Sequence, residues 1–176
     1  ALVELDFDIL PASADAESAA QPGSPLAHAD AEHNILAEFN MGYGDPDSAF
    51  ATAAHTVGDK FHIHKGLGMA IEGRGLVARY DDVEDRLTVW LATQMPHMAH
   101  RTLVNLLGRS ETNTRVVTPD IGGGFGPKLV FYPEDIVIAT AALILKAPVK
   151  WIEDRREHFT TSTQERDQIW DMELAL

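Results

Sequence analysis

Apolar and polar residues alternate in several short stretches of the chain, a pattern typical of strands that bury one face. In the first of them, Val3–Ile9, every second residue is apolar and the residues between are acidic. Similar patterns predict further strands at Ile35–Met41, Val57–His64, Gly75–Asp81, Arg86–Thr93, Arg115–Thr118, Pro148–Glu153 and Ile169–Leu174. The short polar segment "DDVED" (81–85) predicts a hairpin between two of these strands.

Apolar spacing and residues typical of helix ends predict three helices, over Pro46–Ala54, Met98–Leu107 and Pro133–Lys146. Asp45 precedes the first helix as its N-cap, and Gly108 ends the second. The third helix has acidic residues in its first turn and is apolar nearly all round, so we expect it to be buried. Together these elements predict a mixed α/β (α+β) fold, with twisted mixed sheets of short strands and two or three packed helices.

Composition changes between Pro11 and Asn34, where Ala, Ser, Asp, Pro and Gly dominate. This stretch is predicted to be a surface linker with at most a short helical turn. The strand pattern at the first residues, and the pattern still running at Leu176, indicate a piece of a longer chain. The 176 residues have room for one domain or two small ones.

Charge and composition exclude several classes of function. The net charge of −13 and the pI near 4.8 argue against a nucleic-acid-binding surface, which needs a basic face. The chain has no cysteine, so it holds no disulfide, thiolate zinc site or thiolate-ligated iron–sulfur cluster. The longest apolar run, Ile136–Leu145, is too short to span a bilayer, and no secretory signal is evident. We therefore expect a cytoplasmic location.

The most unusual segment is "PDIGGGFGPK" (119–128), with glycines at 122, 123, 124 and 126. Because glycine loses the most backbone entropy on folding, such a run requires either positive φ angles or a close approach to the bare backbone. The P-loop pattern fails because Gly126 is followed by proline, and the Rossmann fingerprint fails at the same Pro127. Spacing alone supports a structural turn and a ligand-binding loop equally.

Six sequence blocks carry a resemblance to a known family. They are "IEGRGLVARYD" (71–81), "LTVWLATQMPH" (87–97), "GGGFGPK" (122–128), "YPED" (132–135), "PVKWIEDRREHF" (148–159) and "ERDQ" (165–168). In this order they resemble the large molybdenum-binding subunit of the xanthine dehydrogenase family, which includes aldehyde oxidoreductases and aerobic carbon monoxide dehydrogenases. The resemblance implies residues 1–34 as the end strand of a preceding domain plus a linker, and residues 35–176 as the first part of a molybdopterin-binding domain.

The resemblance also implies a cofactor site. Gly122, Gly123, Gly124, Phe125 and Gly126 would lie against molybdopterin, whose cytosine dinucleotide form stays open. Phe125 would stand beside the substrate channel as an apolar wall. Gln94 would donate from its amide toward an oxo ligand of molybdenum. Iron–sulfur clusters and FAD would lie only in partner subunits or domains.

The resemblance covers only part of the catalytic machinery. The glutamate that serves as the family's base belongs to a later glycine-rich motif without a counterpart here, so no catalytic and no metal-ligating residue is predicted in this chain. Purine oxidisers carry a substrate-binding glutamate where this chain has Leu129, which favours an aldehyde or similar small carbon substrate. Two functions stay open: part of a molybdenum hydroxylase, completed by the remainder of its subunit, and a non-catalytic module that folds and associates with partner subunits.

Several other charged or titratable residues receive structural interpretations. His62 and His64 share one strand face, as two metal ligands would, but a third ligand is not evident in the sequence, so a solvated face is expected. His97 and His100 are assigned cap or surface roles. Glu72 and Arg74 are expected to hold strands together. The charged run Asp154–Glu157 is predicted to be a salt-bridged surface or subunit contact.

Overall fold

The computed structural model describes residues 4–176, which fall into two units. Unit 1 is formed by the two ends of the chain, up to His64 and from Asp167 onward. Unit 2 consists of residues Lys65–Arg166. No helix in the described part of the chain is long and apolar enough to cross a membrane.

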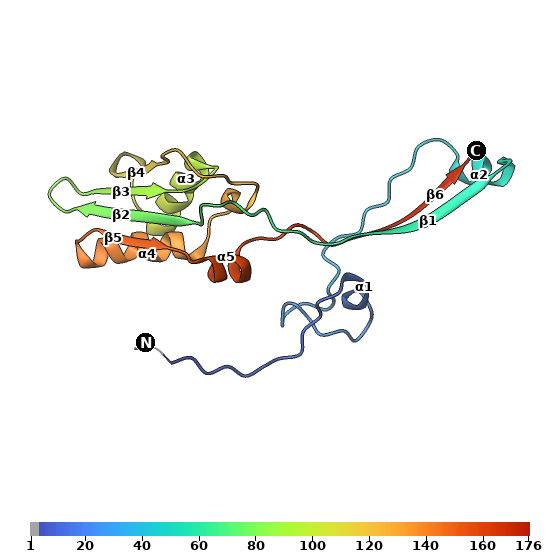
Figure 1. The fold of residues 1–176 in the computed structure, drawn as a ribbon, viewed down its shortest axis with the longest axis horizontal. Coiled ribbons are helices and arrows are strands. Elements are labelled where there is room, and N and C mark those ends of the chain that lie inside the picture. The colour runs from blue at the N-terminus through green and yellow to red at the C-terminus, as the bar shows by residue number, and fades with distance from the viewer. Residues whose placement is uncertain (1–3) are drawn as a thin grey trace. The chain divides into compact units, whose positions relative to one another are not determined.

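Unit 2 is built on a four-stranded mixed sheet (Figure 1). Its strands are β2 (Gly75–Asp81), β3 (Arg86–Leu91), β4 (Thr114–Val117) and β5 (Val149–Ile152), in the order β4-β3-β2-β5. β2 pairs with β3 and β5 antiparallel, whereas β3 and β4 run parallel. The predicted hairpin is confirmed, since Asp81 pairs with Arg86 across the turn.

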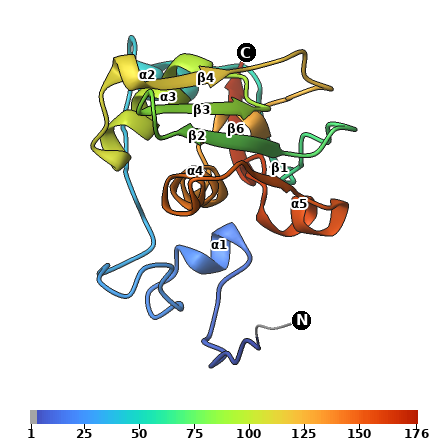
Figure 2. The same ribbon diagram turned by 90° about the vertical axis from the view of Figure 1, so that its left-hand side faces the viewer.

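One face of this sheet is covered by the helices α3 (Pro96–Leu107) and α4 (Pro133–Leu145), as Figure 2 shows. The core consists of sheet residues of one face and of small or aliphatic helix residues, namely Leu76, Ala78, Leu87, Val89, Leu91, Ala99, Leu103, Ala139 and Ala142. The short elements η1 (Glu111–Asn113), η2 (Pro127–Leu129) and α5 (Arg155–Thr161) complete the unit. The predicted mixed α/β fold is confirmed.

The two long helices form where their sequence predicts them. α3 begins two residues earlier than expected, with Pro96 in its first turn, and ends at Gly108, whose φ of 61° lies in the left-handed region. α4 ends at Lys146, which also has a positive φ.

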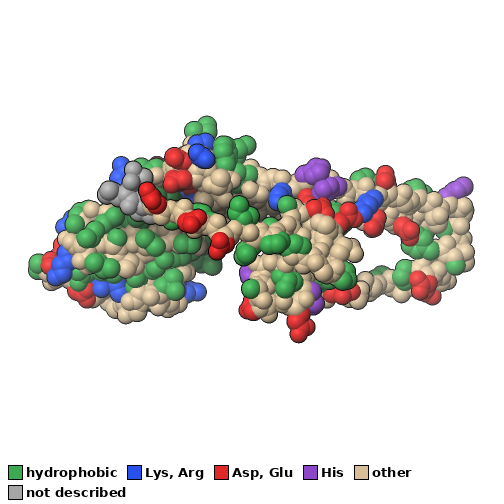
Figure 3. Space-filling model, turned by 90° about the horizontal axis from the view of Figure 1, so that it is seen from below, with side chains coloured by type: hydrophobic (Ala, Val, Ile, Leu, Met, Phe, Trp, Pro, Cys, Tyr) green, Lys and Arg blue, Asp and Glu red, His purple; other side chains and the backbone are tan. Residues whose placement is uncertain are grey.

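The prediction that the third helix is buried all round is wrong. α4 buries only Asp135, Ala139 and Ala142, while Ile144 is 75% exposed. The physical reason is that α4 packs on one side of a single sheet, and no described segment covers its outer side. Figure 3 shows hydrophobic side chains gathered on unit 2 where α4 faces the viewer.

Unit 1 contains a two-stranded antiparallel ribbon of β1 (Thr56–Ile63) and β6 (Gln168–Ala175). It also has two short helices, α1 (Ala16–Ala19) and α2 (Pro46–Thr52). The predicted N-cap of α2 is confirmed, because the Asp45 carboxylate accepts a hydrogen bond of 3.1 Å from the backbone N–H of Ser48.

Two predicted strands are absent from the described residues. Of Val3–Ile9, Val3 lies outside them, and residues 4–9 and 35–41 form no strand. Their apolar side chains stand exposed, Leu36 completely. Alternation produces a strand only where another strand supplies its hydrogen bonds, and none of the described segments pairs with these two.

The charged run Asp154–Glu157 mainly builds a helix start. Asp154 is the N-cap of α5, and its carboxylate accepts from the backbone N–H of Glu157 at 2.7 Å. The Glu157 carboxylate accepts in return from the backbone N–H of Asp154 at 2.7 Å. This reciprocal pair is a capping box. The sequence interpretation assigned these residues to a charged surface and missed the capping motif.

Candidate cofactor-binding site

The glycine loop of residues 122–126 connects the end of β4 to η2, and two of its glycines have positive φ angles. Gly123 has φ 94° and Gly126 has φ 101°, a region that side-chain-bearing residues rarely adopt. Phe125 also has a positive φ of 53° and is 71% exposed. The turn alone therefore explains two of the four glycines.

The other two glycines make room for side chains of the protein itself. A Cβ on Gly122 would lie 2.6 Å from the Cβ of Glu72, and one on Gly124 would lie 2.4 Å from Cδ of Gln94. Both distances are far below a normal carbon–carbon contact. The bare backbone at these two positions thus admits Glu72 and Gln94.

Gln94 is fixed against the loop by two hydrogen bonds. Its backbone N–H donates to the carbonyl oxygen of Lys128 at 2.9 Å, and its side-chain Oε1 accepts from the backbone N–H of Gly126 at 3.0 Å. Because Oε1 accepts this hydrogen bond, the orientation of the amide is fixed, and its Nε2 NH2 group can donate to another acceptor. Within residues 4–176 it donates to no protein acceptor.

A buried lysine anchors the loop from below. Lys128 is buried, and its Nζ donates to Oε2 of Glu72 at 2.6 Å. The same Oε2 accepts from the backbone N–H of Gly122 at 2.7 Å. The hydrogen bond from Lys128 is the main reason why the pKa of Glu72 lies below its usual value. Burial opposes this shift, and the hydrogen bond from Gly122 adds to it.

Sequence reasoning missed this role of Lys128. The residue follows a glycine-rich stretch, where a lysine suggests a ligand-facing cation, yet its ammonium points inward and neutralises Glu72. Glu72 therefore holds the loop in place, and the expectation that it joins strands is wrong.

Arg74 does join strands, as expected. Its Nε donates to Oε2 of Glu153 at 2.7 Å, and its guanidinium lies 3.8 Å over the ring of Tyr132. The other oxygen of Glu153 shares a hydrogen bond of 2.5 Å with Nδ1 of His158 in α5. Burial works against ionisation of Glu153, but the hydrogen bonds from Arg74 and His158 outweigh it and hold its pKa below the usual value. This cluster fixes β2, β5 and α5 to one another.

The loop presents uncharged donors. The backbone N–H groups of residues 123–125 donate to no acceptor in the described part of the chain. With the Nε2 amine of Gln94, they form a set of neutral donors next to the exposed ring of Phe125. Consecutive unpaired N–H groups favour anionic or oxo oxygens. Phe125 is exposed and Gly123 is partly exposed, whereas Gly124 is buried between them. These residues therefore fit a group that offers oxygen acceptors, as the predicted cofactor does.

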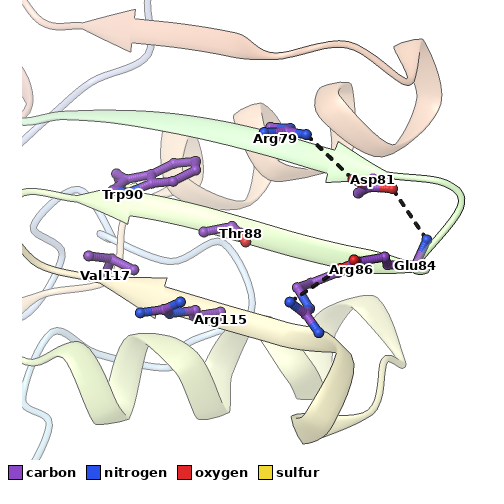
Figure 4. A pocket seen from close by; sticks show the side chains of 8 residues that line it. All are labelled: Arg79, Asp81, Glu84, Arg86, Thr88, Trp90, Arg115 and Val117. Carbon is purple, nitrogen blue, oxygen red and sulfur yellow. Dashed lines mark hydrogen bonds and ion pairs between the residues drawn. The ribbon is translucent and has the colours of Figure 1, made fainter.

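Two cavities lie on unit 2, one away from the glycine loop and one beside it. One of about 400 Å³ is on the open face of the sheet, where Arg79 pairs with Asp81 and Arg86 with Glu84 (Figure 4). It contains none of the predicted site residues. The other, of about 260 Å³, is lined by Glu72 and Pro119, which flank the loop, and by residues of β2, β3 and β5.

The comparisons with known proteins agree with this geometry. The family model described as the molybdopterin cofactor-binding domain matches residues 27–176. This match extends over most of the chain. The chain belongs to the molybdopterin cofactor-binding domain family.

Named relatives of this molybdopterin-binding domain are subunits of oxidoreductases. The nicotine 6-hydroxylase large subunit of Paenarthrobacter nicotinovorans is 36% identical over 99% of this chain and 21% of its own length. The carbon monoxide dehydrogenase large chain of Hydrogenophaga pseudoflava is 36% identical over 98% of this chain and 23% of its own. Quinoline 2-oxidoreductase from Pseudomonas putida 86 superimposes with a TM-score of 0.90 at 31% identity, over 98% of this chain and 22% of its own.

The molybdopterin-binding domain described here thus spans about a fifth of the length of the relatives it matches. The predicted resemblance to the large molybdopterin-binding subunit is confirmed. The structure brings Gln94 and the loop 122–126 together, while their contacts with a cofactor stay predictions.

Proposed function

We propose that this chain is part of the catalytic subunit of a molybdenum hydroxylase and supplies one wall of its cofactor site. The observation that carries the proposal is the hydrogen bond from the Gly126 N–H to Oε1 of Gln94. It fixes the amide and leaves its NH2 group as an unpaired donor beside the glycine loop. Molybdopterin with its metal would supply the two-electron redox chemistry and transfer of a water-derived oxygen to the substrate carbon.

The residues in and around the glycine loop have separate roles in the proposal. The Nε2 amine of Gln94 donates to an oxygen of the cofactor, and the N–H groups of Gly123, Gly124 and Phe125 add further neutral donors. Lys128 and Glu72 hold the loop in place without contacting the cofactor. The exposed ring of Phe125 orients the substrate and excludes water.

The proposed substrate is an aldehyde or a similar small, uncharged carbon compound. Phe125 and Leu129 are both apolar and exposed, and residue 129 carries no carboxylate. The names of relatives point to small or heteroaromatic compounds, namely nicotine, carbon monoxide and quinoline. An apolar wall without a charge suits such substrates better than it suits a polar purine.

The proposed enzyme needs partners. Without a cysteine in its 176 residues, this chain holds no iron–sulfur cluster, so electrons leave through iron–sulfur and flavin subunits or domains. The remaining part of the molybdenum subunit supplies the base and further cofactor contacts. We propose a cytoplasmic enzyme and a molybdopterin in plain or cytosine dinucleotide form.

A non-catalytic module is the second candidate. The outer face of α4, with Val137, Ile144 and Leu145 exposed, favours association with other chains or segments. Such a module would fold and bind partner subunits without turnover.

The test is to purify the chain from its native source with everything that accompanies it. Molybdenum content, pterin fluorescence after oxidation, released cytidine monophosphate and aldehyde-dependent dye reduction are then measured. We expect stoichiometric molybdenum and larger partner chains. The exchange Gln94→Ala should lower turnover at least about tenfold, while Gln164→Ala, at another exposed glutamine, should leave it unchanged.

A complex that forms normally but contains no molybdenum and does not reduce the dye would favour the non-catalytic module. Equal turnover of Gln94→Ala and Gln164→Ala in a loaded enzyme would remove the role proposed for Gln94.

A further inference from the structure

The β1–β6 ribbon of unit 1 brings together two histidines and one aspartate. His62 lies in β1, and His64 follows two residues later on the same face. The strand register pairs Ile63 with Gln168, so continuing it by one residue sets His64 opposite Asp167. Directly opposite residues of an antiparallel pair have their Cβ atoms about 5 Å apart, so the ribbon itself assembles the three side chains.

The three side chains converge on one point. Nε2 of His62 lies 2.8 Å from Oδ1 of Asp167, and the ring centroids of His62 and His64 are 3.9 Å apart. One possible ligand atom from each residue lies within 4.8 Å of the others. Ligand atoms around a single ion at 2.0–2.2 Å have this order of separation, about 3–4 Å. A small movement of the side chains would therefore suffice for all three to reach one ion.

Nearby charge favours a cation at this point. The pKa of the Asp15 carboxyl is held below its usual value mainly by hydrogen bonds from Ser18, and this carboxylate is also close enough to His62 for their charges to interact. Asp15 thus adds a negative charge near His62 to that of Asp167, which contacts the His62 ring directly.

We propose that His62, His64 and Asp167 bind one divalent transition-metal ion such as Zn²⁺, Co²⁺ or Ni²⁺. Imidazole nitrogens suit these borderline ions, whereas Mg²⁺ and Ca²⁺ prefer oxygen ligands alone. Three protein ligands leave at least one position for water. Nε2 of His62 then binds the ion in place of its hydrogen bond to Asp167. The ion is separate from the proposed molybdenum cofactor, whose predicted contacts all lie in unit 2.

The sequence alone led to a different interpretation of these histidines. The sequence predicts a solvated face because no third ligand is evident near them, and both histidines are exposed. Asp167 is 103 residues beyond His64 in the sequence, and only the antiparallel register reveals it.

The test uses the whole chain after removal of bound metal with EDTA. Titration with Co²⁺, followed by its visible absorption, and with Zn²⁺, followed by calorimetry, should give one site per chain. His62→Gln, His64→Gln and Asp167→Asn should each weaken the affinity at least about tenfold. His55→Gln changes another exposed histidine of unit 1 and should leave the affinity unchanged.

Thermal unfolding separates loss of ligands from loss of fold. Zn²⁺ should raise the melting temperature of the parent chain and of His55→Gln but not that of the three ligand variants. His64 lies outside β1 and is exposed, so His64→Gln should keep the melting temperature of the metal-free parent. The proposal is overturned if His64→Gln binds either ion as tightly as the parent. It is equally overturned if His55→Gln weakens binding as much as the ligand variants do.

Discussion

At the scale of single residues, three consecutive glycines serve three different purposes. Gly122 makes room for Glu72, Gly123 adopts a positive φ, and Gly124 makes room for Gln94. The sequence indicates that these positions need either positive φ angles or close contact of another group with the backbone. The identity of the groups that approach it could not be derived, because Glu72 and Gln94 come from segments far from the loop in the chain.

Gly124→Ala tests the contact with Gln94. Gly124 does not have a positive φ, so the added methyl group is harmful mainly because it overlaps Gln94. We expect a loss of about 1–3 kcal/mol in the free energy of unfolding. In the double variant Gly124→Ala/Gln94→Ala, most of this loss should disappear because the overlapping atoms are gone. Urea unfolding of the four chains measures the coupling.

The matched cycle combines Gly122→Ala with Gln94→Ala. Gly122 faces Glu72, so these two losses should add without coupling. Additive losses for Gly124 and Gln94 as well would show that the two residues do not compete for the same space.

The pair of Lys128 and Glu72 predicts an asymmetry between its two halves. The Glu72 side chain is 44% exposed, whereas that of Lys128 is 1% exposed. After Lys128→Met the carboxylate can regain water, and we expect a loss of about 1 kcal/mol. After Glu72→Ala the ammonium stays buried without its partner, and we expect about 3 kcal/mol. Equilibrium unfolding of both variants compares the losses.

The double variant Glu72→Ala/Lys128→Met should be more stable than Glu72→Ala alone, because no buried charge is left unpaired. Equal losses in the two single variants would contradict the burial of Lys128 beneath the loop.

At the scale of elements, the first turn of α4 contains a titratable group with a marked shift. Burial raises the pKa of Asp135 to about 6, against an opposing hydrogen bond from the backbone N–H of Tyr132 and the charge of Arg74. The folded chain therefore binds more protons than the unfolded chain between about pH 4 and pH 6. Stability from this group is present at low pH and is lost as the pH rises through 6.

Asp135→Asn should remove this dependence. Two pKa units correspond to about 3 kcal/mol, so relative to the parent the variant should gain up to about that much between pH 4 and pH 7.5. Urea unfolding followed by the helical circular dichroism signal, at several pH values, measures the difference.

Glu72 and Glu153 have lowered pKa values, so their contributions are lost only as the pH falls below their ordinary range. They are present in both chains and cancel in the comparison. A constant difference between Asp135→Asn and the parent across this pH range would show that Asp135 is ionised as easily in the folded chain as in the unfolded one.

Elements with local signals were predicted well, and elements that need a distant partner were not. The ends of α2 and α3 depend on Asp45 and Gly108, which lie in the sequence next to the turns they cap. A strand, in contrast, depends on a neighbour. The pattern of Ile35–Met41 resembles that of the confirmed strands, yet without a partner among the described residues this segment forms no strand.

At the scale of the whole molecule, both candidate sites depend on residues that only the fold brings together. Gln94 meets Gly126 across 32 residues, and Asp167 meets His62 across 105. The resemblance to one family assigns both residues of the first pair to the same site, although it does not predict their contact with each other. The second pair lies outside any such pattern, and periodicity indicates which face a histidine occupies but not what stands opposite.

The outer face of α4 has a predictable consequence for the behaviour of the chain alone. Val137 and Ile144 are seven residues apart, so they lie on one side of the helix, and both are exposed. We expect this face to bind a hydrophobic dye and to promote self-association. Val137→Gln/Ile144→Gln should reduce both while changing the free energy of unfolding by no more than about 0.5 kcal/mol per site, because little apolar area is lost from the core.

Val83→Gln, at an exposed valine in the β2–β3 turn, is the control and should change neither dye binding nor self-association. Dye fluorescence and light scattering measure the outcome, and a parent chain that is monomeric and binds no dye would show that this face has no tendency to associate.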